Sequence, residues 1–125
     1  MKKFLLIGWI VFGLILAGCG QQGWLSKDEL FEKKQECANY KSNIEKSIEE
    51  ENSKNLNAHK YLEEIFYSTK KNSCLYTYTT SAGENISHFL VDYLTNEVVI
   101  WYNEKTSSID RFKEFDNTVK EFKWE

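Results

Sequence analysis

The spacing of apolar residues predicts an amphipathic helix from Lys27 to about Glu50. Ser26, just before it, and Glu29, in its first turn, have the spacing of a capping box. Residues 49–51 are glutamates at the negative end of the helix dipole, so we expect fraying there and a polar loop over 52–57. The apolar positions of this helix lie on one face: Leu30, Cys37, Tyr40, Ile44 and Ile48.

Beyond this helix the period changes to two, which predicts strands rich in Tyr, Thr, Phe and Ile. Gly83 supplies a positive φ for the second turn. From Ser108 to Lys123 the helical spacing returns. The four predicted strands are Tyr61–Thr69, Cys74–Thr80, Ile86–Tyr93 and Val98–Tyr102.

This order predicts an α+β fold with a long N-terminal helix, a four-stranded antiparallel meander and a C-terminal helix packed on one face of the sheet. The most economical arrangement has both helices over the same face. The segment from Asp92 to Val98 resembles the Asp-x-x-Thr-Gly-Glu-Val hairpin of PepSY-type extracytoplasmic domains, with Asn96 in the glycine position. Asparagine tolerates the left-handed conformation, so the resemblance implies a hairpin at this point.

The chain begins with a pattern typical of an export signal. Lys2 and Lys3 form a short basic region, and residues 4–16 are apolar and uncharged. Such a run has the length of a secretory h-region, about 7–15 residues. It is short for a spanning helix, which needs about 20.

Leu16-Ala17-Gly18-Cys19 closes this run and resembles the lipobox of bacterial lipoprotein precursors. The resemblance implies cleavage before Cys19, a diacylglyceryl group joined to its thiol as a thioether, and often a third acyl chain, such as palmitate, on its new amino group. The chain would then divide into a signal peptide (1–18), an acylated cysteine with a short tether (19–25) and one small domain (26–125). It would be extracytoplasmic and anchored to a bacterial membrane. An ordinary secreted protein and an uncleaved anchor are the alternatives.

Charge argues against nucleic acid as a partner. The whole chain has a formal charge of −3, and the leader contains two lysines and no acidic residue, so the mature domain is more acidic still. Such a domain lacks the basic footprint of nucleic-acid binding. The lipid on Cys19, rather than a basic patch, is therefore the expected membrane contact.

Cysteine usage predicts one disulfide. With Cys19 committed to lipid, Cys37 and Cys74 remain in a compartment where disulfides persist. Two free thiols, or a metal or redox role, are the alternatives, although the chain has no C-x-x-C motif.

The sequence offers no recognisable catalytic or cofactor motif. His59 and His88 lack the paired spacing of zinc ligands, and we expect them on polar surfaces. Asp92 follows His88 on the same side of its strand and could orient it as a base, but no nucleophile motif accompanies them. We therefore expect neither an enzyme nor a bound cofactor or metal.

Aromatic residues on the strands are the candidate interaction residues, because the sheet cannot bury all of them and Tyr and Trp are favoured at interface centres. The set is Tyr76, Tyr78, Tyr93, Trp101 and Tyr102. We expect a non-enzymatic protein-interaction module of the cell envelope. A flat exposed face of Tyr and Trp would favour this reading. A small-ligand carrier, with a closed pocket lined by Phe66, Phe89 and Ile100, is the alternative. A surface enzyme inhibitor, with a protruding loop at 70–73, is another.

Overall fold

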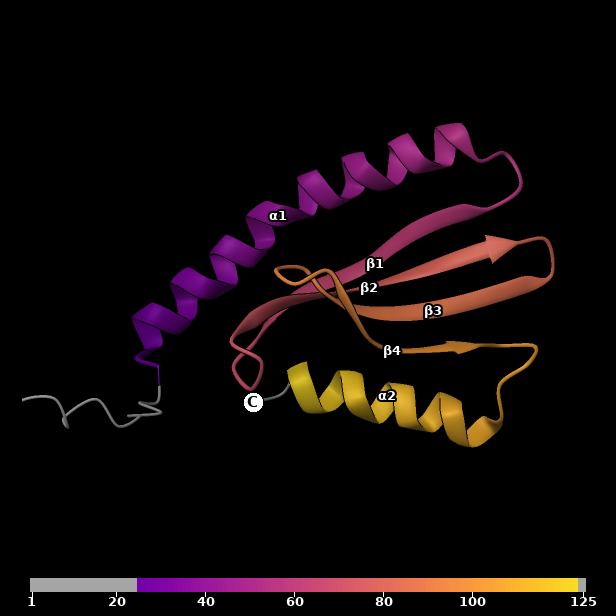
Figure 1. Cartoon of the computed structure of the whole chain (residues 1–125). Helices are drawn as coiled ribbons and strands as arrows, with labels where there is room; N and C mark the ends of the chain where they lie inside the picture. The colour runs from indigo at the N-terminus through magenta and orange to yellow at the C-terminus, as the bar shows by residue number, and fades with distance from the viewer. Residues whose placement is uncertain (1–24, 124–125) are drawn as a thin grey trace, which may run out of the picture.

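The computed structural model describes residues 25–123 and shows the predicted α+β order of elements (Figure 1). A long helix is followed by four consecutive strands and a second helix. The bounds are α1 Lys27–Lys54, β1 His59–Ser68, β2 Ser73–Ala82, β3 Asn85–Asp92, β4 Glu97–Asn103 and α2 Ile109–Lys123.

The four strands form one antiparallel meander in the order β1-β2-β3-β4. Each of its three turns contains a residue with positive φ: Asn72 at 47°, Gly83 at 60° and Asn96 at 57°. The hairpin at Asn96 and the turn at Gly83 are therefore confirmed. A β-bulge between Leu62 and Glu64 interrupts the pairing of β1 with β2.

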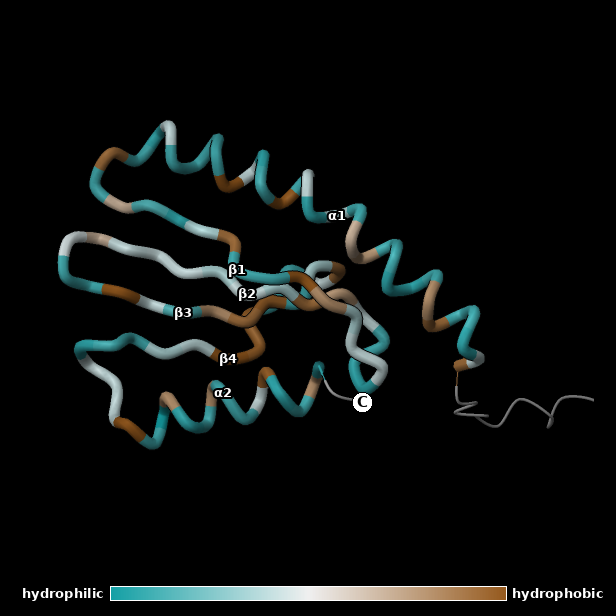
Figure 2. The backbone as a smooth tube through the Cα atoms, turned by 180° about the vertical axis from the view of Figure 1, so that it is seen from behind, coloured by the Kyte–Doolittle hydropathy of each residue, from teal (hydrophilic) through white to brown (hydrophobic). Residues whose placement is uncertain are grey.

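The two helices pack on opposite faces of the sheet, so the expectation of one shared face is wrong. Phe115 and Phe122 of α2 pack with Leu75 of β2, whereas Cys37 of α1 packs with Cys74. Cys74 and Leu75 are neighbours on one strand, and successive side chains point to opposite faces. Figure 2 shows the sheet lying between the two helices.

Helix α1 begins as predicted and extends further than predicted. The Ser26 side chain accepts a hydrogen bond from the Glu29 amide, and the Glu29 carboxylate accepts one from the Ser26 amide, which confirms the capping box. At the other end the helix continues to Lys54 because β1 stabilises it. Asn52 accepts from the Lys60 amide at 2.7 Å and donates to the Lys60 carbonyl at 2.9 Å, and Glu51 forms an ion pair with Lys60.

A disulfide joins Cys37 to Cys74, with a Cα–Cα distance of 5.4 Å. The predicted pairing is thereby confirmed, and α1 lies on the Cys74 side of β2 as the bridge requires. The bridge lies near the β1–β2 turn, because Cys74 is the second residue of β2 and pairs with Tyr67 near the end of β1. It fastens α1 to the β1–β2 half of the sheet.

The predicted leader, lipobox and Cys19 lie outside the described residues. Within residues 25–123, neither helix has the combination of length and apolar character that crossing a membrane requires.

Candidate interaction surface

Six aromatic side chains form a continuous row on the α1 face of the sheet. We call it the aromatic row; in spatial order its members are Tyr40, Tyr93, Tyr76, Tyr78, Phe89 and Trp101. Ring centroids are 4.8 Å apart for Tyr78 and Phe89 and 6.1 Å apart for Phe89 and Trp101, with nearly parallel planes. The antiparallel register causes this stacking, because Tyr78 lies opposite Phe89 and Phe89 opposite Trp101.

Helix α1 covers only part of this face, because it packs chiefly on β1 and is bridged to β2. On β3 and β4 the side chains of this face carry no charge: Ser87, Phe89, Val91, Val98, Trp101 and Asn103. Trp101 is 48% exposed, and Val98 is exposed to a similar extent. We call these six residues the open half-face; Trp101 and Val98 are its exposed members, whereas Val91 and Asn103 are buried. Its apolar centre without charges resembles the composition of interface cores.

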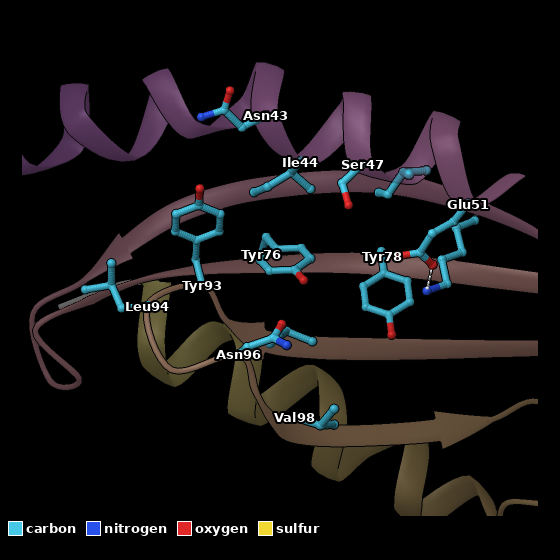
Figure 3. Close-up of a pocket in the computed structure, with 13 residues that line it drawn as sticks. Asn43, Ile44, Ser47, Glu51, Tyr76, Tyr78, Tyr93, Leu94, Asn96 and Val98 are labelled. Carbon is cyan, nitrogen blue, oxygen red and sulfur yellow. Dashed lines mark hydrogen bonds and ion pairs between the residues drawn. The ribbon is translucent and has the colours of Figure 1, made fainter.

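A groove lies between α1 and the sheet, and Val91 and Val98 of the open half-face belong to its lining (Figure 3). Its volume is about 690 Å³. Ile44 and Ser47 point into it from the helix, and Tyr76 and Tyr78 rise from the sheet. The β3–β4 turn closes one end with Tyr93, Leu94 and Asn96. The groove is therefore amphipathic, with hydroxyl and amide groups among aliphatic and aromatic side chains.

An ion pair closes the other end of the groove. Glu51 of α1 pairs with Lys60 of β1, and the Lys60 ammonium lies 5.3 Å from the centre of the Tyr78 ring. Burial raises the pKa of the Tyr76 hydroxyl above its ordinary value, with Tyr78 adding to the rise and Lys60 opposing it. Burial also raises the pKa of Tyr78, and the Glu51 carboxylate adds to that rise. Both phenols are thus neutral hydrogen-bonding groups at neutral pH.

The raised pKa values predict a loss of stability in alkali. A phenol whose pKa is higher in the folded chain contributes stability that is fully present below its unfolded pKa of about 10 and is lost as pH rises through the folded value. We expect the free energy of unfolding, measured with urea, to fall above about pH 10. In the double variant Tyr76→Phe/Tyr78→Phe it should fall less steeply with pH. An equally steep fall in this double variant would contradict the assignment.

One of the five predicted interaction residues does not belong to this surface. Tyr102 is 7% exposed and packs against Phe112 and Phe115 beneath α2. The physical reason is strand alternation, which sends Tyr102 to the face opposite its neighbour Trp101. The other four predicted residues all belong to the aromatic row. Tyr40 and Phe89 were missed as members, although the tight turn at Gly83 implies a register that places Phe89 opposite Tyr78.

The pocket expected for a small-ligand carrier does not form among its three predicted residues. Phe66 and Ile100 belong to the core under α2, whereas Phe89 lies on the opposite face in the aromatic row.

The β1–β2 turn, which an inhibitor was expected to present as a protruding loop, packs against α2. Lys70 and Lys71 lie over the Phe122 ring, and Lys70 pairs with Glu121 of α2.

His88 lies on the face covered by α2, contrary to the expected polar surface. Its ring stacks on Tyr102 at 4.6 Å, and its Nε2 is 2.9 Å from a Glu104 oxygen. Asp92 does not orient it, because the Asp92 carboxylate accepts hydrogen bonds from Ser73 and from two turn amides. Across residues 25–123, no three His, Cys, Asp or Glu side chains converge in a way that could hold a metal ion.

Comparisons with models of protein families, with curated proteins and with solved structures find no match to this chain. The surface itself is therefore the basis on which a function is inferred.

Proposed function

We propose that this protein is a lipid-anchored, non-enzymatic module that binds an envelope protein through the open half-face. The observation that carries the proposal is the uncharged strip around Phe89 and Trp101, which α1 leaves uncovered. Within the row, the rings of Tyr78, Phe89 and Trp101 stack on one another and form one continuous aromatic surface. Such a surface suits shape-matched apolar packing against a protein.

Both edges of the sheet support binding through the face rather than by strand addition. At the β1 edge, Asn52 occupies the amide and the carbonyl of Lys60. At the β4 edge, the Arg111 side chain donates to the Trp101 carbonyl at 3.2 Å. Side chains that occupy edge groups in this way oppose pairing with another strand. A partner therefore meets the side chains of the face more readily than the backbone of an edge.

The Trp101→Ser variant tests the surface. We expect crosslinking in intact membranes to capture a partner with the native chain, and the yield to fall at least about tenfold in the variant, because a central Trp commonly contributes 2 kcal/mol or more. The control is Ile109→Ser, which removes another exposed apolar side chain, 72% exposed, at the start of α2. Equal capture by native chain and Trp101→Ser would refute the proposal. Unfolding curves of both variants check that the fold is unchanged.

The anchor is tested at Cys19. If acyl chains are attached there, Cys19→Ala should leave the chain unprocessed, and mass spectrometry of the native protein should find a mature N-terminus at Cys19 with acyl mass attached. Two or more chains hold a protein stably on a bilayer, whereas one holds it only marginally. A native N-terminus elsewhere without acyl mass would argue against the anchor while leaving the open half-face intact.

The groove favours one second candidate, a carrier of a small amphipathic ligand. Its volume of about 690 Å³ lies within the range of ligand sites, about 300–1,000 Å³. Native mass spectrometry of protein released gently from membranes discriminates between the two functions. A bound small molecule that Ser47→Trp removes would favour the carrier, since Ser47 points into the groove.

A further inference from the structure

The first turns of α1 expose an aromatic side chain on the face that points away from the sheet. Phe31 is 60% exposed, and Leu25, just before the helix, is also exposed. The sheet-facing positions of this helix are those of Leu30, Cys37 and Ile44. At 3.6 residues per turn, Phe31 lies well outside that stripe. Packing within the domain therefore gives no reason for a large aromatic residue there.

Two lysines flank this aromatic side chain. Lys27 and Lys34 lie four residues before and three residues after Phe31, so they are its neighbours on the helix surface. Neither forms an ion pair with another residue in the described range, whereas Lys33 pairs with Glu36 on a different flank. Asp28 is the one acidic residue at neighbouring spacing. At helix-neighbour spacing Phe31 is thus surrounded by two lysines and one acidic residue, although the first turns of α1 also contain Glu29 and Glu32.

The position of Phe31 in the fold brings it close to the proposed anchor. The bridge from Cys37 to Cys74 lies beside the β1–β2 turn, so the residues of α1 before it run past that end of the sheet (Figure 1). From Cys19 to Leu25 the backbone spans at most about 20 Å. Leu56, which is 84% exposed, follows the opposite end of α1.

We propose that Phe31, with Leu25, Lys27 and Lys34, contacts an anionic lipid surface and sets the orientation of the domain on it. This inference rests on the proposed lipid anchor. The aromatic ring enters the interfacial region, and the two ammonium groups interact with anionic headgroups. The start of α1 then faces the bilayer, and the end that carries Leu56 points away from it. A lipid anchor alone would hold the domain near the membrane without choosing this orientation.

Photo-crosslinking of the full chain tests the contact. p-Benzoylphenylalanine replaces Phe31 in one variant and Leu56 in the matched control, and each membrane-extracted protein is placed in vesicles of phosphatidylcholine with phosphatidylglycerol. We expect lipid adducts from position 31 and few from position 56. The adducts at position 31 should decrease when Lys27→Gln/Lys34→Gln is added, when phosphatidylcholine is used alone, and at high salt, which screens the charges.

Adduct yields at position 31 no higher than at position 56 would overturn the inference. The acyl mass on Cys19, measured on the same samples, reports the anchor separately. Acylated protein without adducts at position 31 refutes the contact and leaves the proposed function standing. Adducts at position 31 on a chain without acyl mass support the contact and refute the anchor.

Discussion

Replacing Cys37 and Cys74 together by serine is expected to lower the free energy of unfolding by about 3–4 kcal/mol. The bridge closes a loop with a sequence separation of 37 residues, and its loss frees that loop in the unfolded ensemble. In a domain this small, such a loss is a large part of the total stability. Urea unfolding of the double variant and the native chain measures the difference.

The effect should be concentrated in α1. Cys37 and Ile44 are the buried residues of this helix, and its other contacts are partly exposed or lie at its end. Without the bridge we expect the amides of α1 to lose hydrogen-exchange protection before those of β2 and β3. Native protein treated with reductant is the control, because it opens the same bond without a substitution. Unchanged protection in α1 would show that side-chain packing alone holds the helix.

The groove and the ring stack of the open half-face should depend differently on the disulfide. The groove needs α1 in place, because Ile44, Ser47 and Glu51 form its helical wall. The stack of Tyr78, Phe89 and Trp101 is built by strand register alone. A partner that binds the open half-face should therefore tolerate loss of the bridge better than a ligand that occupies the groove.

The element order was predictable from the sequence because each element has a clear period and each turn contains a residue suited to it. Gly83 and Asn96 both adopt the positive φ expected of them. The extent of α1 was not predictable in the same way. The glutamates at 49–51 are unfavourable near a helix C-terminus, yet the helix continues past them. Lys60, across the loop, holds Glu51 and Asn52 in place. Such tertiary contacts leave no periodic signal.

The site was predictable in composition and only partly in geometry. The strands carry more aromatic side chains than two helices can cover, which predicted that some would be exposed. Four of the five predicted residues belong to the aromatic row. Periodicity identifies the apolar face of a helix but not the face of the sheet that it meets, so both helices were expected together. The cysteine pair indicates which face of the sheet α1 meets. Cys74 directs α1 to one face, and the neighbouring Leu75 directs α2 to the other.

Replacing Asp92 by alanine is expected to lower the free energy of unfolding by about 3 kcal/mol. Asp92 is a buried residue at the end of β3, and one of its carboxylate oxygens accepts three hydrogen bonds. The donors are the Ser73 hydroxyl at 2.6 Å, the Leu94 amide at 3.0 Å and the Thr95 amide at 3.3 Å. Alanine removes the acceptor and leaves the hydroxyl, which belongs to a buried serine, without it.

Asp92→Asn is the matched control, because an amide oxygen can accept the same three hydrogen bonds without a charge. We expect its loss of stability to be clearly smaller than that of the alanine variant. Both are measured by urea unfolding at neutral pH. Because the carboxylate holds the β3–β4 turn, which closes one end of the groove with Tyr93 and Leu94, the alanine variant should also loosen that end. Equal stability of alanine variant and native chain would show that the turn is held by its backbone alone.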